Sequence, residues 1–327
     1  MRRLLCVLLS AALAVLSCGC ELQENAVYAL TGDVSADLES LDMPYIGIVL
    51  KSLDGEFYPL VKAGAEAEAD RLGVEVIVVA PDSEENAEEQ AEIVDIMSNM
   101  ALDVLAIAPC EEGLLTQSLQ NAEKQGKILL AVDENLEYDG CAAYIGSDSL
   151  LGGQREGAFA AQMATTDTAI VLYGSENSRN HTDRVSGLEK SLAANDITVL
   201  CSQAGSVTRS SAQKQTEQLL KKFDSVGVIC ATDDDIAIGA SRAVRAAGRE
   251  IPIVSFDGTP EVLRLIQIGE IAGAIVQDAY QMGVSCVDTA LALYRGEQAE
   301  SVSIPMTLVT QRTADYYLSR MEQQIQD

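Results

Sequence analysis

The chain has 327 residues, of which 48% are hydrophobic, and at about 150 residues per domain this length predicts two domains. Its 50 acidic residues against 22 basic ones give a formal net charge of −28, which argues against a nucleic-acid binder that needs clustered lysine and arginine. The single histidine, His181, argues against a metal site built from several histidines.

The first segment has the pattern of a signal peptide, which we assign to residues 1–17. Two arginines precede an apolar run from Leu4 to Leu16, and small residues and cysteines follow it. The run is short for a membrane span, although a short transmembrane anchor is the alternative. Its end resembles a bacterial lipoprotein box. Cys18 and Cys20 are both candidates for lipidation, and we favour Cys18, whose lipid would hold the protein on the membrane surface.

An acidic tether is predicted over residues 18–43, which contain no basic residue and no clear hydrophobic period. Removal of residues 1–17 takes away two arginines and no acids, so the mature charge is 20 − 50 = −30. Such a charge favours solubility and repels anionic lipid and nucleic acid.

Apolar runs of strand length then recur along the chain. They are rich in valine and isoleucine and mostly do not alternate with polar residues, as expected of strands buried on both faces. These runs are 45–50, 74–80, 104–108, 128–132, 142–145, 169–173, 197–201, 226–230, 253–256 and 273–276.

Amphipathic stretches of helical length lie between these runs, among them 84–100, 150–164, 209–222 and 236–247. Glycines stand where helices should end. Repeated strand–helix units predict an α/β fold with parallel sheets and right-handed crossovers.

Two segments of the chain echo each other. Residues 103–133 and 227–257 both run through a strand, an acidic loop, a helix, a glycine and a second strand that ends in aspartate. Asp133 and Asp257 therefore end equivalent strands in two similar halves, and ligands of open α/β sheets bind beyond such strand ends. For either aspartate alone, a turn cap is the favoured alternative.

Motifs of catalysis are missing, so we expect no enzyme, no cofactor and no metal site. The chain has no phosphate-binding glycine loop and no nucleophile elbow. We expect His181 to be an exposed residue of a polar loop at 176–183, and Gly152-Gly153 to begin a helix. The run Asp233–Asp235 lacks the spacing of a calcium loop, and we interpret it as a helix N-cap with a polar contact to ligand.

Five cysteines lie beyond the lipoprotein box, at positions 110, 141, 201, 230 and 286. Their odd number and scattered spacing argue against a full disulfide framework, and a single bridge remains open.

From Tyr45 to about Thr310 the chain resembles the type 1 periplasmic binding proteins of the ribose/galactose group, the substrate-binding components of sugar ABC transporters. The pieces that carry the resemblance occur in the family's order. They are 46–49 with 54–58, 72–76, 145–149 with Gly152-Gly153, 182–187, 231–240, and Val254-Ser-Phe-Asp-Gly-Thr-Pro260 followed by 269–277.

The resemblance implies two Rossmann-like lobes with parallel sheets, joined by three hinge crossings near Ser147, Gln277 and Pro305, with a ligand cleft between them. The lobes would comprise residues 44–146 with 278–305, and residues 147–277 with 306–327. It further implies aromatic contacts to a sugar ring and polar contacts to its hydroxyls. Carried over by position, the site residues are Phe57, Tyr58, Asp133, Arg184, Asp233, Asp257 and Gln277.

The chain departs from the ribose-type pattern at several positions. Glu134 stands where an arginine is often found, Asp233 and Gly55 stand where asparagines are usual, and the aromatic expected near Val207 is absent. A more acidic and less aromatic pocket leaves the ligand open to an amino sugar, a cyclic polyol or another small polyhydroxylated molecule.

The main hypothesis is a non-enzymatic, lipid-anchored and extracytoplasmic protein that captures a monosaccharide or similar polyol by hinge closure and delivers it to an ABC permease. We expect a monomer. The alternative is a protein that presents its ligand to a chemoreceptor or sensor kinase. A regulator core of the LacI type shares the fold, but the signal peptide and the missing helix-turn-helix argue against it.

Overall fold

The computed structural model describes residues 43–326. The predicted signal peptide, the predicted lipidation site Cys18 and nearly all of the predicted acidic tether therefore lie outside the described residues. Within that range, no helix has the length and apolar character needed to cross a membrane.

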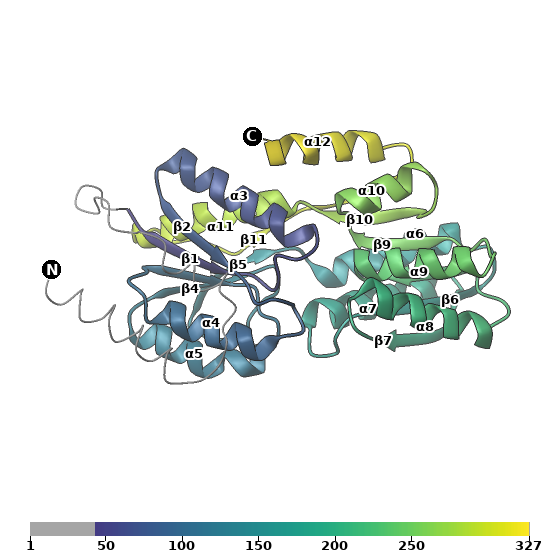
Figure 1. Cartoon of the computed structure of the whole chain (residues 1–327), viewed down its shortest axis with the longest axis horizontal. Helices are drawn as coiled ribbons and strands as arrows, with labels where there is room; N and C mark the ends of the chain where they lie inside the picture. The colour runs from purple at the N-terminus through teal and green to yellow at the C-terminus, as the bar shows by residue number, and fades with distance from the viewer. Residues whose placement is uncertain (1–42, 327) are drawn as a thin grey trace, which may run out of the picture. The chain divides into compact units, whose positions relative to one another are not determined.

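A first lobe, the N-terminal lobe, is built on a six-stranded sheet in the order β11-β5-β4-β3-β1-β2, with all neighbours parallel (Figure 1). Its strands are β1 (Tyr45–Val49), β2 (Glu75–Val79), β3 (Val104–Ile107), β4 (Ile128–Val132), β5 (Cys141–Gly146) and β11 (Val302–Ser303). Its helices are α3 (Phe57–Leu72), α4 (Ala87–Ser98), α5 (Glu112–Lys124) and α11 (Ala279–Tyr294).

The C-terminal lobe repeats this plan on a sheet in the order β12-β10-β9-β8-β6-β7. Its strands are β6 (Thr168–Tyr173), β7 (Thr198–Ala204), β8 (Val228–Ala231), β9 (Ile253–Asp257), β10 (Gly273–Gln277) and β12 (Met306–Thr310). Its helices are α6 (Ser149–Met163), α7 (Arg179–Ala194), α8 (Arg209–Lys222), α9 (Asp234–Ala246), α10 (Pro260–Gln267) and α12 (Ala314–Gln326).

The predicted α/β class with two lobes is confirmed. The chain passes between the two sheets at three places: between β5 and α6, between β10 and α11, and between β11 and β12. Figure 1 shows α12 lying over α10 and extending toward α3, and α12 contacts helices of both lobes.

Burial explains why the strands lack alternation. All four residues of β3 and of β8 are buried, and so are all five of β9 and of β10. A parallel strand covered by helices on both faces has no solvent side for polar residues. The pattern of the sequence therefore identified the central strands.

Glycine allows two helices of the C-terminal lobe to touch through their backbones. A Cβ atom at Gly153 of α6 would lie 2.0 Å from the carbonyl oxygen of Arg184 on α7, and one at Gly187 of α7 would lie 2.1 Å from that of Leu150. Gly153 thus lies inside a helix and packs it against its neighbour, and this close crossing fixes the position of Arg184.

Two expectations from the sequence were wrong in detail. The polar stretch 176–183 is not only a loop, because α7 begins at Arg179. The sheets are also not wholly parallel, since the edge strand β12 runs antiparallel to β10. Neither β11 nor β12 was predicted, because both follow the hinge and their burial patterns are mixed.

Candidate functional site

Two aspartates occupy matching places in the two lobes. Asp133 follows β4 and Asp257 ends β9, and these strands hold the same position in their respective sheets. Both residues have left-handed backbone conformations, with φ of 62° and 92°. Few residues other than glycine adopt this conformation, although aspartate and asparagine tolerate it best. The echo in the sequence therefore corresponds to a shared turn that directs both carboxylates beyond the strand ends.

On the N-terminal lobe, Asp133 and two aromatic residues form one cluster. The Tyr58 hydroxyl donates a hydrogen bond of 2.8 Å to Asp133 Oδ2. The ring of Phe57 meets that of Tyr58 edge-on at 5.2 Å. Asp133 is only 4% exposed, and its Oδ1 atom has no hydrogen-bond partner among the described residues. A buried carboxylate oxygen without a donor is suited to accept one from a ligand.

On the C-terminal lobe, Asp257 is held between an arginine and an amide. Arg184 lies 3.3 Å from Asp257 Oδ1, and Gln277 Nε2 donates a hydrogen bond of 2.6 Å to the same oxygen. The guanidinium of Arg184 also donates to the carbonyl of Thr232 at 2.8 Å and lies 3.8 Å from the centroid of the Phe256 ring. Burial raises the pKa of Asp257, and the nearby Arg184 opposes that rise.

Asp233 is the N-cap of α9. Its Oδ1 accepts hydrogen bonds from the backbone N–H groups of Asp235 at 2.8 Å and Ile236 at 3.2 Å. Burial and the charges of Asp257 and Glu84 raise the pKa of Asp233 well above its ordinary value. The predicted cap is present, and no described side chain bonds to the second oxygen of this carboxylate.

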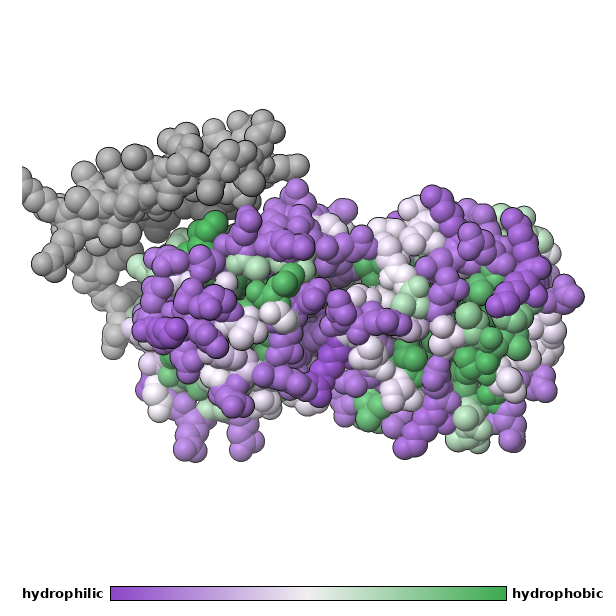
Figure 2. Space-filling model, turned by 90° about the horizontal axis from the view of Figure 1, so that it is seen from below, coloured by the Kyte–Doolittle hydropathy of each residue, from purple (hydrophilic) through white to green (hydrophobic). Residues whose placement is uncertain are grey.

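A cavity of about 570 Å³ lies between the lobes and is lined by both of them. Phe57, Tyr58, Asp233 and Asp257 line it directly, whereas Asp133, Arg184 and Gln277 adjoin it through their bonds to Tyr58 and Asp257. The structure thus brings all seven predicted site residues together. Figure 2 shows that hydrophilic side chains predominate where the lobes meet. The volume suits a small polar ligand.

Glu134 ties the two lobes together at one end of this cleft. Its carboxylate accepts hydrogen bonds from Ser178 Oγ at 2.8 Å and from the backbone N–H of Arg179 at 2.5 Å. These residues are the N-cap and the first residue of α7, so a side chain of one lobe caps a helix of the other. Lys51 Nζ pairs with the same carboxylate at 2.6 Å. We call Lys51, Glu134 and Ser178 the cross-lobe cap.

Electrostatics agree with this arrangement. Burial disfavours the Lys51 charge, but Glu134 and Asp133 outweigh it and raise the lysine pKa. Burial likewise opposes the charge of Glu134, and Lys51 with the donors of α7 lowers its pKa. Both groups are therefore ionised inside the closed cleft. A further bond, from the N–H of Glu261 to Glu56 at 2.7 Å, joins the lobes at the cleft mouth.

The sequence reasoning missed Lys51, Glu84 and the role of Glu134. Lys51 comes two residues after β1 and Glu84 lies before α4, and both line a second cavity beside the first. Glu134 was the signal in the sequence that could have revealed Lys51. An acid at a position where an arginine is often found implies that a cation lies nearby to balance it, and Lys51 is that cation.

The expectation for His181 was wrong. It is buried on α7, and its Nδ1 atom lies 2.8 Å from Thr232 Oγ1. Burial, Arg184 and Lys51 lower its pKa well below 6.5, so the ring is neutral. The polar residues around His181 predicted a loop, whereas they form the first turn of α7, one face of which lines the cleft.

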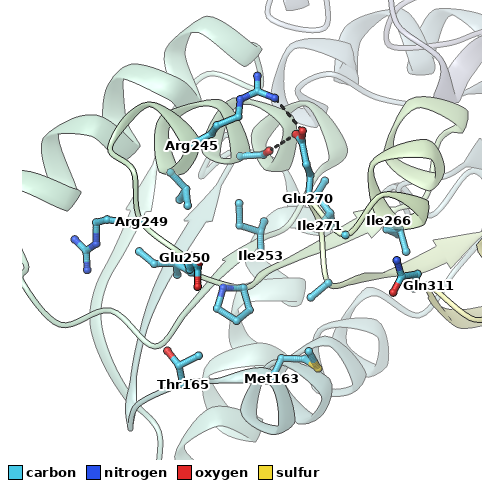
Figure 3. A pocket seen from close by; sticks show the side chains of 16 residues that line it. Met163, Thr165, Arg245, Arg249, Glu250, Ile253, Ile266, Glu270, Ile271 and Gln311 are labelled. Carbon is cyan, nitrogen blue, oxygen red and sulfur yellow. Dashed lines mark hydrogen bonds and ion pairs between the residues drawn. The ribbon is translucent and has the colours of Figure 1, made fainter.

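A separate hollow of about 680 Å³ lies at the opposite end of β9 (Figure 3). In it, Glu270 accepts hydrogen bonds from Arg245 and Ser241, and Arg249 donates to backbone carbonyl groups. Across residues 43–326, no group of three or more His, Cys, Asp or Glu side chains is placed to hold a metal ion, and the five described cysteines are free.

Comparison with known proteins gives a consistent result. A family model described as "Periplasmic binding protein domain" matches residues 46–298. The ribose import binding protein of Haemophilus influenzae is 30% identical over 265 residues, which cover 80% of this chain and 89% of that protein. The ribose import binding protein of Escherichia coli is 28% identical over 275 residues, covering 84% and 92%.

Solved structures show the same fold. A periplasmic solute-binding protein of an ABC transporter from Actinobacillus succinogenes, with bound D-allose, matches with a TM-score of 0.79 at 23% identity, over 84% of this chain and 100% of that one. A solute-binding protein from Bacillus halodurans with bound myo-inositol matches with a TM-score of 0.78 at 20% identity, over 87% and 100%.

Proposed function

Because the chain belongs to the periplasmic binding protein domain family, we propose that it is an extracytoplasmic solute-binding protein that captures a monosaccharide or a similar small polyol and delivers it to an ABC permease. The observation that carries this proposal is the facing pair of networks, Tyr58–Asp133 on one lobe and Arg184–Asp257–Gln277 on the other. They place charged acceptors and donors around an aromatic surface.

These groups suit a polyhydroxylated ligand. Sugar hydroxyls both donate and accept, and bonds to charged partners in a desolvated cleft are stronger than neutral ones. Phe57 and Tyr58 offer an apolar face for the ring C–H groups. Relatives point the same way, since their names specify ribose, allose and xylitol. The protein acts by binding and closure, with no chemical step on the ligand.

A thermal-shift screen of the purified protein against sugars and polyols tests this function. A ligand present at about 100 times its dissociation constant should add about 2.7 kcal/mol to the free energy of unfolding. Small-angle scattering should then show a compact, closed form at saturation, as expected of a hinge clamp. If the protein bound no member of a broad panel, or bound one without closing from an open form, the proposal would be wrong.

The lipid anchor is part of the same proposal, with Cys18 as the lipidated residue. The support is the position of Cys18 after an apolar run and a small residue. Cys18→Ser should release the protein from the membrane fraction, whereas Cys20→Ser should leave it there. Release by Cys20→Ser alone would identify the other cysteine as the anchor.

A further inference from the structure

The cleft carries a strong excess of negative charge. Nine acidic side chains and two basic ones, Arg209 and Arg242, line its cavity. Arg209 is committed to partners, because it pairs with Asp235 at 2.6 Å and with Glu261 at 2.7 Å. Arg242 is exposed on α9. Hence neither arginine neutralises the carboxylates deeper in the cavity.

The two buried cations of the cleft are also already ion-paired with carboxylates. Lys51 pairs with Glu134 at 2.6 Å, and Arg184 pairs with Asp257 at 3.3 Å. That assignment leaves Glu84 and Asp233 without a cation in ion-pair contact, although Lys51 acts on Glu84 and Arg184 acts on Asp233 at longer range. Within residues 43–326, no side chain or backbone group hydrogen-bonds or ion-pairs with the Glu84 carboxylate, which lines both cavities of the cleft. Asp233 accepts only from backbone N–H groups.

An independent sign of a missing donor is Asp133. This side chain is 4% exposed, and one of its oxygens has no partner among the described residues. It acts on Glu84 electrostatically, as do Asp257 and Asp235, so these carboxylates share one space. Burial raises the pKa of Glu84 to about 7. The neighbouring carboxylates act in the same direction, whereas the charge of Lys51 opposes the rise. Uncompensated acids in a desolvated site favour a cation among them.

Resting on the proposed solute-binding function, we propose that the ligand is a polyol or sugar carrying a cationic amine, which the carboxylates of Glu84 and Asp233 receive. Hydroxyl groups can satisfy hydrogen-bond acceptors but cannot offset their charge. An ammonium group does both, because it has three donors and a positive charge. The remaining hydroxyls would then contact Asp133, Asp257 and Arg184.

The test compares matched pairs of ligands by calorimetry on the full chain. Each neutral scaffold found by the screen is paired with its amino derivative, beginning with glucose against glucosamine, galactose against galactosamine, and an inositol against the matching inosamine. We expect the amine to bind at least about tenfold tighter, and its N-acetyl form to lose that gain. Equal or weaker binding of the amine across all pairs would overturn the inference.

Variants locate the effect. Glu84→Gln should reduce the preference for the amine to within about threefold, measured as the ratio of the affinities of this variant for the amine and for the neutral scaffold. Glu88→Gln removes the same charge from an exposed position on α4 and serves as the matched control. An unchanged preference in Glu84→Gln would contradict the role of this residue. Closure on a neutral sugar with no gain from the amine would refute this inference alone, whereas no binding by any pair would refute the solute-binding function too.

Discussion

Asp133 and Asp257 show how one backbone conformation can serve binding. With φ of 62° and 92°, both residues turn the chain sharply at the ends of β4 and β9, so that each carboxylate faces the cleft. Asp196 has a similar φ of 59° but is exposed and lies away from the cleft. Left-handed aspartate is therefore not in itself a sign of function here, and the partners of each side chain decide its role.

Asp257→Asn should weaken ligand binding about tenfold to a hundredfold, because it removes a charged acceptor from a desolvated site. Asparagine keeps the shape and tolerates the left-handed backbone. The change also deprives buried Arg184 of its ion pair, so the free energy of unfolding should fall by roughly 3 kcal/mol. Calorimetry and denaturant titration measure the two effects.

The matched control is Asp196→Asn, which changes the same side chain in the same backbone region outside the cleft. It should leave both affinity and stability nearly unchanged. If Asp257→Asn lost stability but bound ligand as well as the unaltered protein does, Asp257 would be a structural turn residue and not a ligand contact.

The sequence predicted residues of this kind where the pattern was repeated. Asp133 and Asp257 were predicted from their equivalent strands, and Gln277 from the resemblance to the family. Lys51, Glu84 and His181 were not identified as parts of the cleft, because each depends on how the two lobes meet. A single stretch of sequence carries no trace of a contact made across a hinge.

At the scale of elements, α7 depends on the opposite lobe for its N-terminal cap. Ser178 occupies the N-cap position, but its hydroxyl makes no cap bond within the helix and donates instead to Glu134. Glu134 also accepts the N–H of Arg179, so an anion lies at the positive end of the helix dipole. Closure of the lobes is thus coupled to the completion of a helix terminus.

Glu134→Gln should weaken ligand binding by about tenfold, because the closed form loses a charged cap and leaves Lys51 without its close partner. Scattering at saturating ligand should show incomplete closure. A double-mutant cycle with Lys51→Met measures the coupling between the pair, which should be favourable by about 1–3 kcal/mol.

Glu137→Gln is the matched control, because Glu137 also pairs with Arg179 across the cleft but is exposed. Exposed ion pairs contribute little, so this variant should change affinity by less than about twofold. Equal losses from the two variants would mean that general charge between the lobes, and not the cap, favours closure.

The elements themselves were predictable to different degrees. Central strands such as β8 and β9 gave unbroken apolar runs, because helices cover both faces of the sheets. The edge strand β12 alternates between buried and exposed residues and reverses direction, so no run marked it. The start of α7 was hidden because its first turn faces a polar cleft.

At the scale of the whole molecule, negative charge outweighs positive by 28 in the full chain, and part of that excess is concentrated in the cleft. Burial and like charges raise the pKa values of Glu84, Asp233 and Asp257 together. Ionisation of these carboxylates in the ligand-free protein therefore lowers the free energy of unfolding. Ligand binding and stability are linked through the same groups.

The sign of the resulting pH dependence follows from the direction of these shifts. A carboxyl whose pKa is raised on folding still holds its proton at a pH where the unfolded chain has released it. Folding is then favoured by acid, and stability falls as pH rises from the unfolded pKa to the folded one. For Glu84 that window runs from the ordinary 4.5 to about 7.

Glu84→Gln should therefore be more stable than the unaltered protein at about pH 8, by about 1–3 kcal/mol, and nearly equal to it at about pH 4, where the glutamate is largely protonated in both the folded and the unfolded chain. Denaturant titrations of the ligand-free protein at the two pH values measure this difference. The groups around Glu84 that titrate or carry charge, and so set its window, are Lys51, Tyr58, Cys110, Asp133, Asp233, Asp235 and Asp257.

Glu88→Gln separates this local effect from the general charge of the chain, since it removes one negative charge from an exposed site. A gain that grows with pH in Glu84→Gln but not in Glu88→Gln locates the strain in the cleft. Equal gains in stability in both variants would show that charge repulsion over the whole molecule, and not the desolvated Glu84 carboxylate, causes the loss of stability as pH rises. In that case an amine in the ligand would have no local charge to relieve, so this measurement bears on ligand class without requiring any ligand.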